Sequence, residues 1–131
     1  MPTERTRRLA SQFAVDRAQL ENRRILGDDL AQPRDVEHFA YFPDCSALDA
    51  AARQLEGAGF TGSIFAAGGR FSLCARRVDA LDEESVRRFV RDVCEIVEAN
   101  GGEYDGWGAP VIVARRPTIS IPDSPADIHW S

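Results

Sequence analysis

Apolar residues recur along the first quarter of the chain with the spacing of a helix. Between a Thr3 N-cap and a stop at Gly27, the sequence predicts one helix over residues 4 to about 26. At about 100° per residue, one narrow stripe contains Leu9, Phe13, Asp16 and Leu20. We therefore expect a helix that lies on the main body or on a partner, with most of its surface in water.

The next apolar pattern is that of a strand. In VEHFAYF, residues 36–42, both alternating sets of positions are largely apolar, which is typical of a strand covered on both faces. The N-terminal helix, the C-terminal tail or a partner could cover the second face. A helix follows to about Glu56, with Ser46 and Asp49 as its S-x-x-D start.

Two further strands are predicted over residues 60–66 and 70–78, separated by the hairpin residues 67–69. Asp82 then caps the helix with the strongest periodicity, whose inner face contains Val86, Phe89, Val90, Val93 and Val97. The run GEYDGWGAP supplies a fourth extended segment. This order predicts an α+β fold, a ferredoxin-like βαββαβ sandwich in which two helices cover one face of a four-stranded antiparallel sheet, with an added N-terminal helix.

The same pattern divides the chain into three parts. Residues 1–35 hold the N-terminal helix and a linker, residues 36–110 hold the ferredoxin-like domain, and residues 111–131 are predicted to be an extended, largely irregular tail. Its first residues, VIVA, favour a short further strand.

Composition and charge narrow the function. All 16 basic residues are arginine, which excludes a lysine nucleophile or Schiff base, and the formal net charge is −5. Residues 36–110 contain 7 Arg and 13 acidic residues, so we expect no direct binding of nucleic acid. No segment resembles a signal peptide or a membrane span, and three cysteines match no disulfide framework. We expect a cytoplasmic protein that binds no membrane.

Several motifs for catalysis or cofactor binding can be set aside. GAGFTG, residues 57–62, spells G-x-G-x-x-G, but a helix precedes it and a strand follows, the reverse of a dinucleotide site. His38 on an apolar strand is more typical of packing than of catalysis, and neither Cys74 nor Cys94 has an obvious base beside it. We predict no catalytic residue, no metal and no cofactor.

One segment is unusual. Glu103-Tyr104-Asp105-Gly106-Trp107-Gly108 gathers aromatic, acidic and glycine residues at the end of a chain with few aromatics. Tyr and Trp are frequent anchors of protein interfaces, but Trp107 could equally fill the core and Asp105 cap a turn. The candidate partner-binding residues are Tyr104, Asp105, Trp107, His38 and Tyr41.

These motifs resemble one family. The run GGEYDGWGAP, the opening VEHFAYFPD, an alanine-rich helix ending in AGF, and a preceding helix followed by GDDL are similar to the ribonuclease E activity regulator B family, over roughly residues 5–110. The resemblance implies a ferredoxin-like domain without catalytic activity. Such a domain binds ribonuclease E or a related endoribonuclease, lowers or redirects its cleavage, and so changes mRNA abundance.

Two function classes follow. The first is a non-enzymatic protein-binding regulator, for which the acidic side chains Glu83, Glu84, Asp92, Glu95 and Glu98 of one predicted helix could meet a basic ribonuclease segment. The alternative is a small-molecule or effector-binding module that uses the sheet face around His38, Tyr41 and Trp107. A homodimer is compatible with either class.

Overall fold

The sheet and helices follow the predicted order. The computed structural model describes residues 3–67, 70–113 and 128–130. The helices are α1 (Glu4–Ile25), α2 (Cys45–Gly57) and α3 (Glu83–Ala99). The strands are β1 (Arg34–Phe42), β2 (Thr61–Ala67), β3 (Arg70–Asp79), β4 (Glu103–Gly108), β5 (Pro110–Ile112) and β6 (Ile128–Trp130).

The main sheet has the strand order β2-β3-β1-β4. Every neighbouring pair in it is antiparallel. With β1 and β3 in the centre and α2 and α3 as crossovers, this is the ferredoxin-like arrangement. The predicted α+β fold class, the four antiparallel strands of the main sheet and the added N-terminal helix are confirmed.

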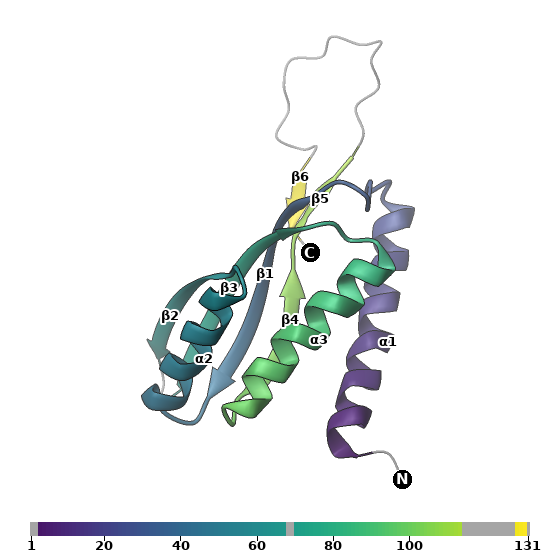
Figure 1. Ribbon diagram of the computed structural model, residues 1–131. Helices are drawn as coiled ribbons and strands as arrows, with labels where there is room; N and C mark the ends of the chain where they lie inside the picture. Colours follow the sequence, from purple (N-terminus) through teal and green to yellow (C-terminus); the bar gives the residue numbers. More distant parts are fainter. Residues whose placement is uncertain (1–2, 68–69, 114–127, 131) are drawn as a thin grey trace.

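All three helices lie on one side of this sheet. Figure 1 shows α2 and α3 side by side, with α1 next to α3 and close to it near the start of α3. One core lies under α2 and the other lies between α3, α1 and the sheet. All five residues predicted for the inner face of α3 are buried: Val86, Phe89 and Val90 belong to the second core, and Val93 and Val97 belong to the first.

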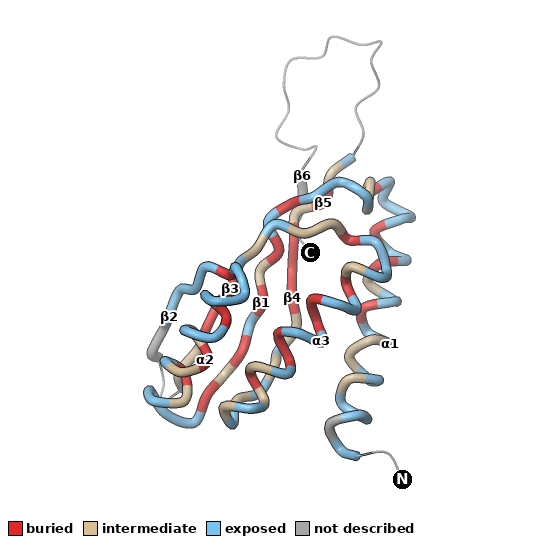
Figure 2. The backbone as a smooth tube through the Cα atoms, in the orientation of Figure 1, coloured by how far each residue is buried: buried red, intermediate tan, exposed pale blue. Residues whose placement is uncertain are grey.

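Strand β1 alternates strictly in burial. Its even-numbered residues face the helices and are buried, whereas Asp35, Glu37, Phe39 and Tyr41 face the other side and are exposed or half-buried. Figure 2 shows this alternation along the strand. Because α1 joins the helix layer, it does not cover the second face of the sheet. Among the described residues, no helix or strand covers that face.

The ends of the helices follow from local side chains. The Thr3 and Asp82 side chains accept hydrogen bonds from the backbone amides of Thr6 and Ser85, as predicted. The expected start of α2 was wrong: its N-cap is Asp44, whose side chain accepts from the Ala47 amide at 2.8 Å. Asp44 directly follows the strand break at Pro43, so the helix can begin two residues earlier than Ser46 allows.

The last described residues form a second, two-stranded sheet in which β5 pairs with β6 in antiparallel register. The short strand expected after Ala109 is present, whereas β6 was not predicted. The remainder of the predicted irregular tail, residues 114–127 and 131, lies outside the described residues.

Candidate partner-binding site

Strand β4 carries the unusual segment and places its side chains on different sides. His38 is opposite Trp107 and Ala40 is opposite Tyr104, with a register shift between the two pairs. Gly106, with φ of +96°, lies in this bulge, where a residue with a Cβ would be strained. The bulge turns Asp105 outward, where it is exposed, while Trp107 points toward the helices.

Trp107 belongs to the core. It is only 7% exposed, and its indole Nε1 donates a hydrogen bond of 2.8 Å to Asp16 Oδ1. Its ring also packs edge-on against Phe89, with centroids 5.4 Å apart, and the Arg23 guanidinium lies 5.4 Å from the ring centroid. Of the two interpretations left open for Trp107, packing is the one that the structure shows, and Trp107 attaches α1 to the sheet.

Asp16 is the polar member of the apolar stripe on α1. It is 3% exposed, and Oδ1 also accepts a hydrogen bond of 2.8 Å from Gln12 Nε2. Burial raises the pKa of its carboxyl group, against the lowering effect of the two hydrogen bonds from Gln12 and Trp107. The acid that interrupts the stripe therefore lies at the contact between α1 and β4.

His38 and Tyr104, both predicted as partner-binding residues, contact each other. His38 Nδ1 lies 2.9 Å from the Tyr104 hydroxyl, and the imidazole is 1% exposed between the rings of Phe60 and Phe89. Burial, and secondly the charge of Arg77, lower the His38 pKa to about 3, so the ring is neutral at physiological pH. Burial also raises the pKa of the Tyr104 hydroxyl. His38 thus holds Tyr104 in place from inside the fold.

A buried ionic network joins the far end of α1 to the strands. Asp28 accepts hydrogen bonds from Arg23 at 2.9 Å and from Arg34 at 2.6 Å, and all three side chains are at most 1% exposed. The two arginines also donate to the backbone carbonyls of Ala109 and Pro110, each at 2.9 Å. This network positions the residues that follow β4 against α1 and β1.

A groove opens beside β4, between the N-terminal half of α1 and the end of α3. Its volume is about 790 Å³. Figure 2 shows that the buried residues of α1 are confined to the half near the start of α3. In the other half, Leu9 and Phe13 are only half-buried against the core. The apolar lining is Leu9, Val15, Cys94 and Tyr104. Val15 is 61% exposed although it is apolar.

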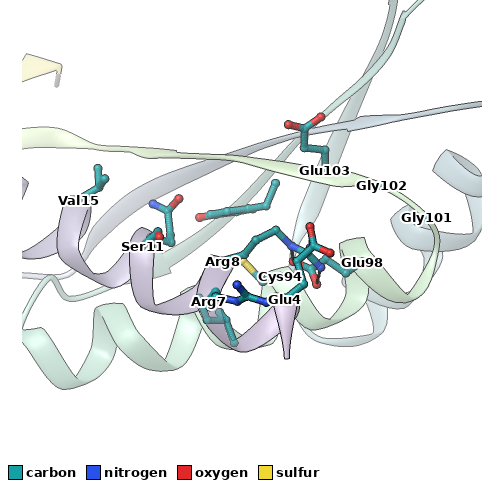
Figure 3. Close-up of a pocket in the computed structure, with 13 residues that line it drawn as sticks. Glu4, Arg7, Arg8, Ser11, Val15, Cys94, Glu98, Gly101, Gly102 and Glu103 are labelled. Carbon is teal, nitrogen blue, oxygen red and sulfur yellow. Dashed lines mark hydrogen bonds and ion pairs between the residues drawn. The ribbon is translucent and has the colours of Figure 1, made fainter. Parts of the chain in front are cut away.

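The rim of this groove is charged, as Figure 3 shows. Arg8 donates to both carboxylate oxygens of Glu98, at 3.1 and 2.9 Å, and lies 3.4 Å from Glu4. Glu103 of β4 and Arg7 of α1 also line the groove, although the Glu103 carboxylate points away from Arg7 and Arg8 in Figure 3. The groove therefore combines an apolar floor with a rim of mixed charge, which is the composition of a protein-binding surface.

Tyr41 lies on the opposite side of the sheet from His38 and Trp107. It lines a smaller hollow of about 280 Å³ on the open face, together with Phe39, Ser63, Ser72 and Cys74. Burial raises the Cys74 pKa to about 11, and its hydrogen bond to Glu37 acts in the same direction. Because two of the three residues of the alternative effector site are under the helices, the structure does not bring these three together.

The acidic side chains expected to meet a basic partner are interleaved with arginines on α3. Glu83 lies 3.2 Å from Arg87 and 3.4 Å from Arg17 of α1, and Glu98 is bound by Arg8. The first turns of α3 therefore carry little uncompensated negative charge. Asp92 and Glu95 are exposed nearer its end.

Sequence reasoning missed Arg23, Asp28 and Arg34 as structural residues. In the sequence, an Arg at the end of a helix and an Asp after the following glycine look like an ordinary exposed ion pair. Only the tertiary fold shows that the pair is buried. The segment from Gly57 to Gly62 runs from the last residue of α2 into the start of β2, so a helix leads into it and a strand leads out, as expected. Cys45, Cys74 and Cys94, all within the described residues, form no disulfide.

Within residues 3–67, 70–113 and 128–130, no group of three or more His, Cys, Asp or Glu could hold a metal ion. No described helix combines the length and the apolar character needed to cross a membrane.

These features define a small α+β protein with a ferredoxin-like core, a helix layer widened by α1, and a groove beside β4. The family model described as regulator of ribonuclease activity B matches residues 14–109. The chain belongs to this family, as its motifs suggested, and this family regulates ribonuclease activity. The matched range includes Asp16 and Trp107, which join α1 to β4. A comparison with curated proteins finds no match.

Proposed function

We propose that this protein binds ribonuclease E or a related endoribonuclease and changes its cleavage of mRNA by covering part of its surface. The observation that carries the proposal is the family match over residues 14–109, which contains the whole EYDGWG segment. The protein acts in the cytoplasm, where the ribonuclease acts, and its own side chains catalyse no reaction.

The side chains considered for catalysis support this interpretation, because each has a packing role. His38 is enclosed by aromatic rings and hydrogen-bonded to Tyr104, with a pKa near 3 that removes it from acid–base chemistry at neutral pH. The raised pKa of Cys74 keeps its thiol protonated and unreactive.

The surface we assign to the partner is the groove between α1, α3 and β4. It includes Tyr104, while His38 and Trp107 act as positioning residues that fix Tyr104 and α1 from inside. Asp105 is exposed on the same strand but does not line the groove. Tyr41 on the open face lies outside this surface. An exposed apolar residue such as Val15, surrounded by charge, is typical of an interface anchor.

The test uses purified ribonuclease E, an RNA substrate and increasing amounts of this protein. We expect a saturable change in cleavage rate and a complex detectable by calorimetry. Val15→Arg should weaken both. The matched control is Ile25→Arg, which introduces the same charge at an exposed apolar residue of the same helix, 75% exposed and away from the groove. No complex and an unchanged cleavage rate with the unaltered protein would refute the proposal.

A further inference from the structure

The two edges of the main sheet differ in how they are protected. Strand β4 forms one edge, and its bulge, Gly106 and the exposed Asp105 disrupt a regular row of backbone groups. Natural edge strands use bulges and charged residues in this way to prevent pairing with other chains. The edge at β4 is therefore poorly suited to receive a further strand.

Strand β2, at the other edge, has none of these devices. Its sequence TGSIFAA contains no charge and no proline. All seven residues pair with β3 in continuous register from Thr61–Arg76 to Ala67–Arg70, without a bulge. Within the residues that the structure describes, no strand pairs with its outer edge. The outer backbone N–H and C=O groups are thus in a regular row that a strand could extend.

Ile64, at the centre of β2, adds an apolar contact to this edge. It is opposite the buried Leu73 and so faces the helix layer, yet it remains 55% exposed. A second strand placed beside β2 would cover this side chain.

We propose that the edge of β2 binds the β2 edge of a second copy of this chain, in antiparallel register about a two-fold axis at Ile64. Such an axis places each residue opposite its own copy or opposite one at equal distance from the axis. A charged residue on the axis would lie opposite its own copy, which is destabilising, whereas β2 has no charge and Ile64 lies opposite Ile64.

The difference between the edges also limits the assembly to two chains. With one free edge and one blocked edge, the contact is isologous and closes after a single pairing. Figure 1 shows β2 and α1 at opposite sides of the molecule. The groove is lined by residues of α1, of α3 and of β4 with the turn before it, so it lies away from β2. The pairing leaves both grooves free, so it is independent of the proposed ribonuclease binding.

Sedimentation equilibrium of the full chain over a concentration series tests the pairing. We expect the mass of the unaltered protein to rise toward twice 14.5 kDa. Ile64→Lys brings two like charges together at the axis, so it should keep the monomer mass. Ile25→Lys, at an apolar position of α1 that is 75% exposed, should dimerise as the unaltered protein does.

A second measurement needs no substitution. Hydrogen exchange should show slower exchange at high protein concentration for the amides of residues 61–67 that point away from β3. A monomer at every concentration, dimerisation of folded Ile64→Lys, or a dimer in which these amides exchange as fast as in the monomer would each overturn the proposal. Ribonuclease binding by monomeric Ile64→Lys would show that the two surfaces act separately.

Discussion

At the scale of single residues, polar side chains connect α1 to the sheet. A buried carboxylate is costly unless hydrogen bonds satisfy it, and Asp16 Oδ1 receives two of them, from Trp107 and Gln12, whereas the buried Oδ2 has no hydrogen-bond partner among the described residues. These hydrogen bonds explain why the apolar stripe of α1 tolerates an acid. They also explain why the indole of Trp107 is directed inward.

Replacing Trp107 with Phe removes the indole donor and leaves the Asp16 carboxylate buried with one hydrogen bond. We expect the free energy of unfolding to fall by roughly 1–3 kcal/mol, measured by urea denaturation with circular dichroism. In a double-mutant cycle, Asp16→Leu and Trp107→Phe together should cost less than the sum of the two single changes. Additivity within about 0.5 kcal/mol would show that the bond is not stabilising.

Stability should also fall with acid because of His38. Its folded-state pKa of about 3 lies below the ordinary 6.5. As the pH falls through 6.5, the unfolded chain binds a proton that the folded chain does not, so the unfolded state is favoured. Between these pKa values the loss reaches about 1.4 kcal/mol per pH unit.

The measurement is the unfolding free energy of the unaltered protein and of His38→Gln between about pH 7 and pH 5. The raised pKa of Asp16 has the opposite effect on the pH dependence, but both proteins share it, so their difference isolates His38. Equal pH dependence in the two proteins would contradict the assignment.

At the scale of elements, short-range side chains decide where helices begin, and a buried cluster decides how the elements meet. Asp44 starts α2 and Asp82 starts α3. Asp28, by contrast, joins α1, β1 and the residues after β4 through two arginines that are distant from one another in sequence.

The identity of the α2 cap can be tested with two alanine substitutions. Asp44→Ala removes the acceptor for the Ala47 amide and should cost about 1 kcal/mol. Ser46→Ala changes an exposed residue within the first turn and should change stability by less than about 0.5 kcal/mol. Thermal unfolding measures both, and a larger loss for Ser46→Ala would restore Ser46 as the cap.

Asp28→Asn is a small chemical change, but it should lower the free energy of unfolding strongly. It leaves Arg23 and Arg34 buried without a compensating charge, for which we expect a loss of about 3–5 kcal/mol. Asp49→Asn is the matched control, because it removes the carboxylate of the exposed Asp49–Arg53 pair on α2 and should cost less than about 1 kcal/mol. Similar losses for the two variants in urea denaturation would exclude a special role for the cluster.

At the scale of the whole molecule, α1 serves two purposes along its length. Its second half, with Asp16, Leu20 and Arg23, is buried against the sheet and α3. Its first half forms one wall of the groove. The same helix therefore completes the core and supplies part of the proposed binding surface.

A chain that begins at Ala14 should separate these two purposes. It keeps the buried residues of α1 but removes Leu9 and the half-buried Phe13, at a cost of roughly 1–3 kcal/mol. We expect a folded protein, judged by circular dichroism, that no longer binds ribonuclease E in calorimetry. Undiminished binding would place the partner on another surface.

Much of the fold follows from local sequence. Apolar periodicity predicted the β2–β3 hairpin and α3, because the pattern of apolar side chains reports which face is buried. The apolar run of β1 predicted a strand, but it predicted cover on both faces, whereas the residues of β1 alternate in burial and only one face lies under the helices. The same rule predicted the narrow stripe of α1, including Asp16. The cap prediction failed at the start of α2, where Asp44 and not Ser46 is the N-cap.

Local sequence could not show which polar residues are inside. His38, Trp107 and Tyr104 were recognised as unusual, but their hydrogen bonds join residues more than sixty positions apart. The elements packed around Asp28 decide whether it is solvated or buried. In the same way, the surroundings of the β2 edge decide whether it stays unpaired. Periodicity and caps are properties of neighbours in the chain, whereas burial and pairing are properties of neighbours in space, and only the folded arrangement decides them.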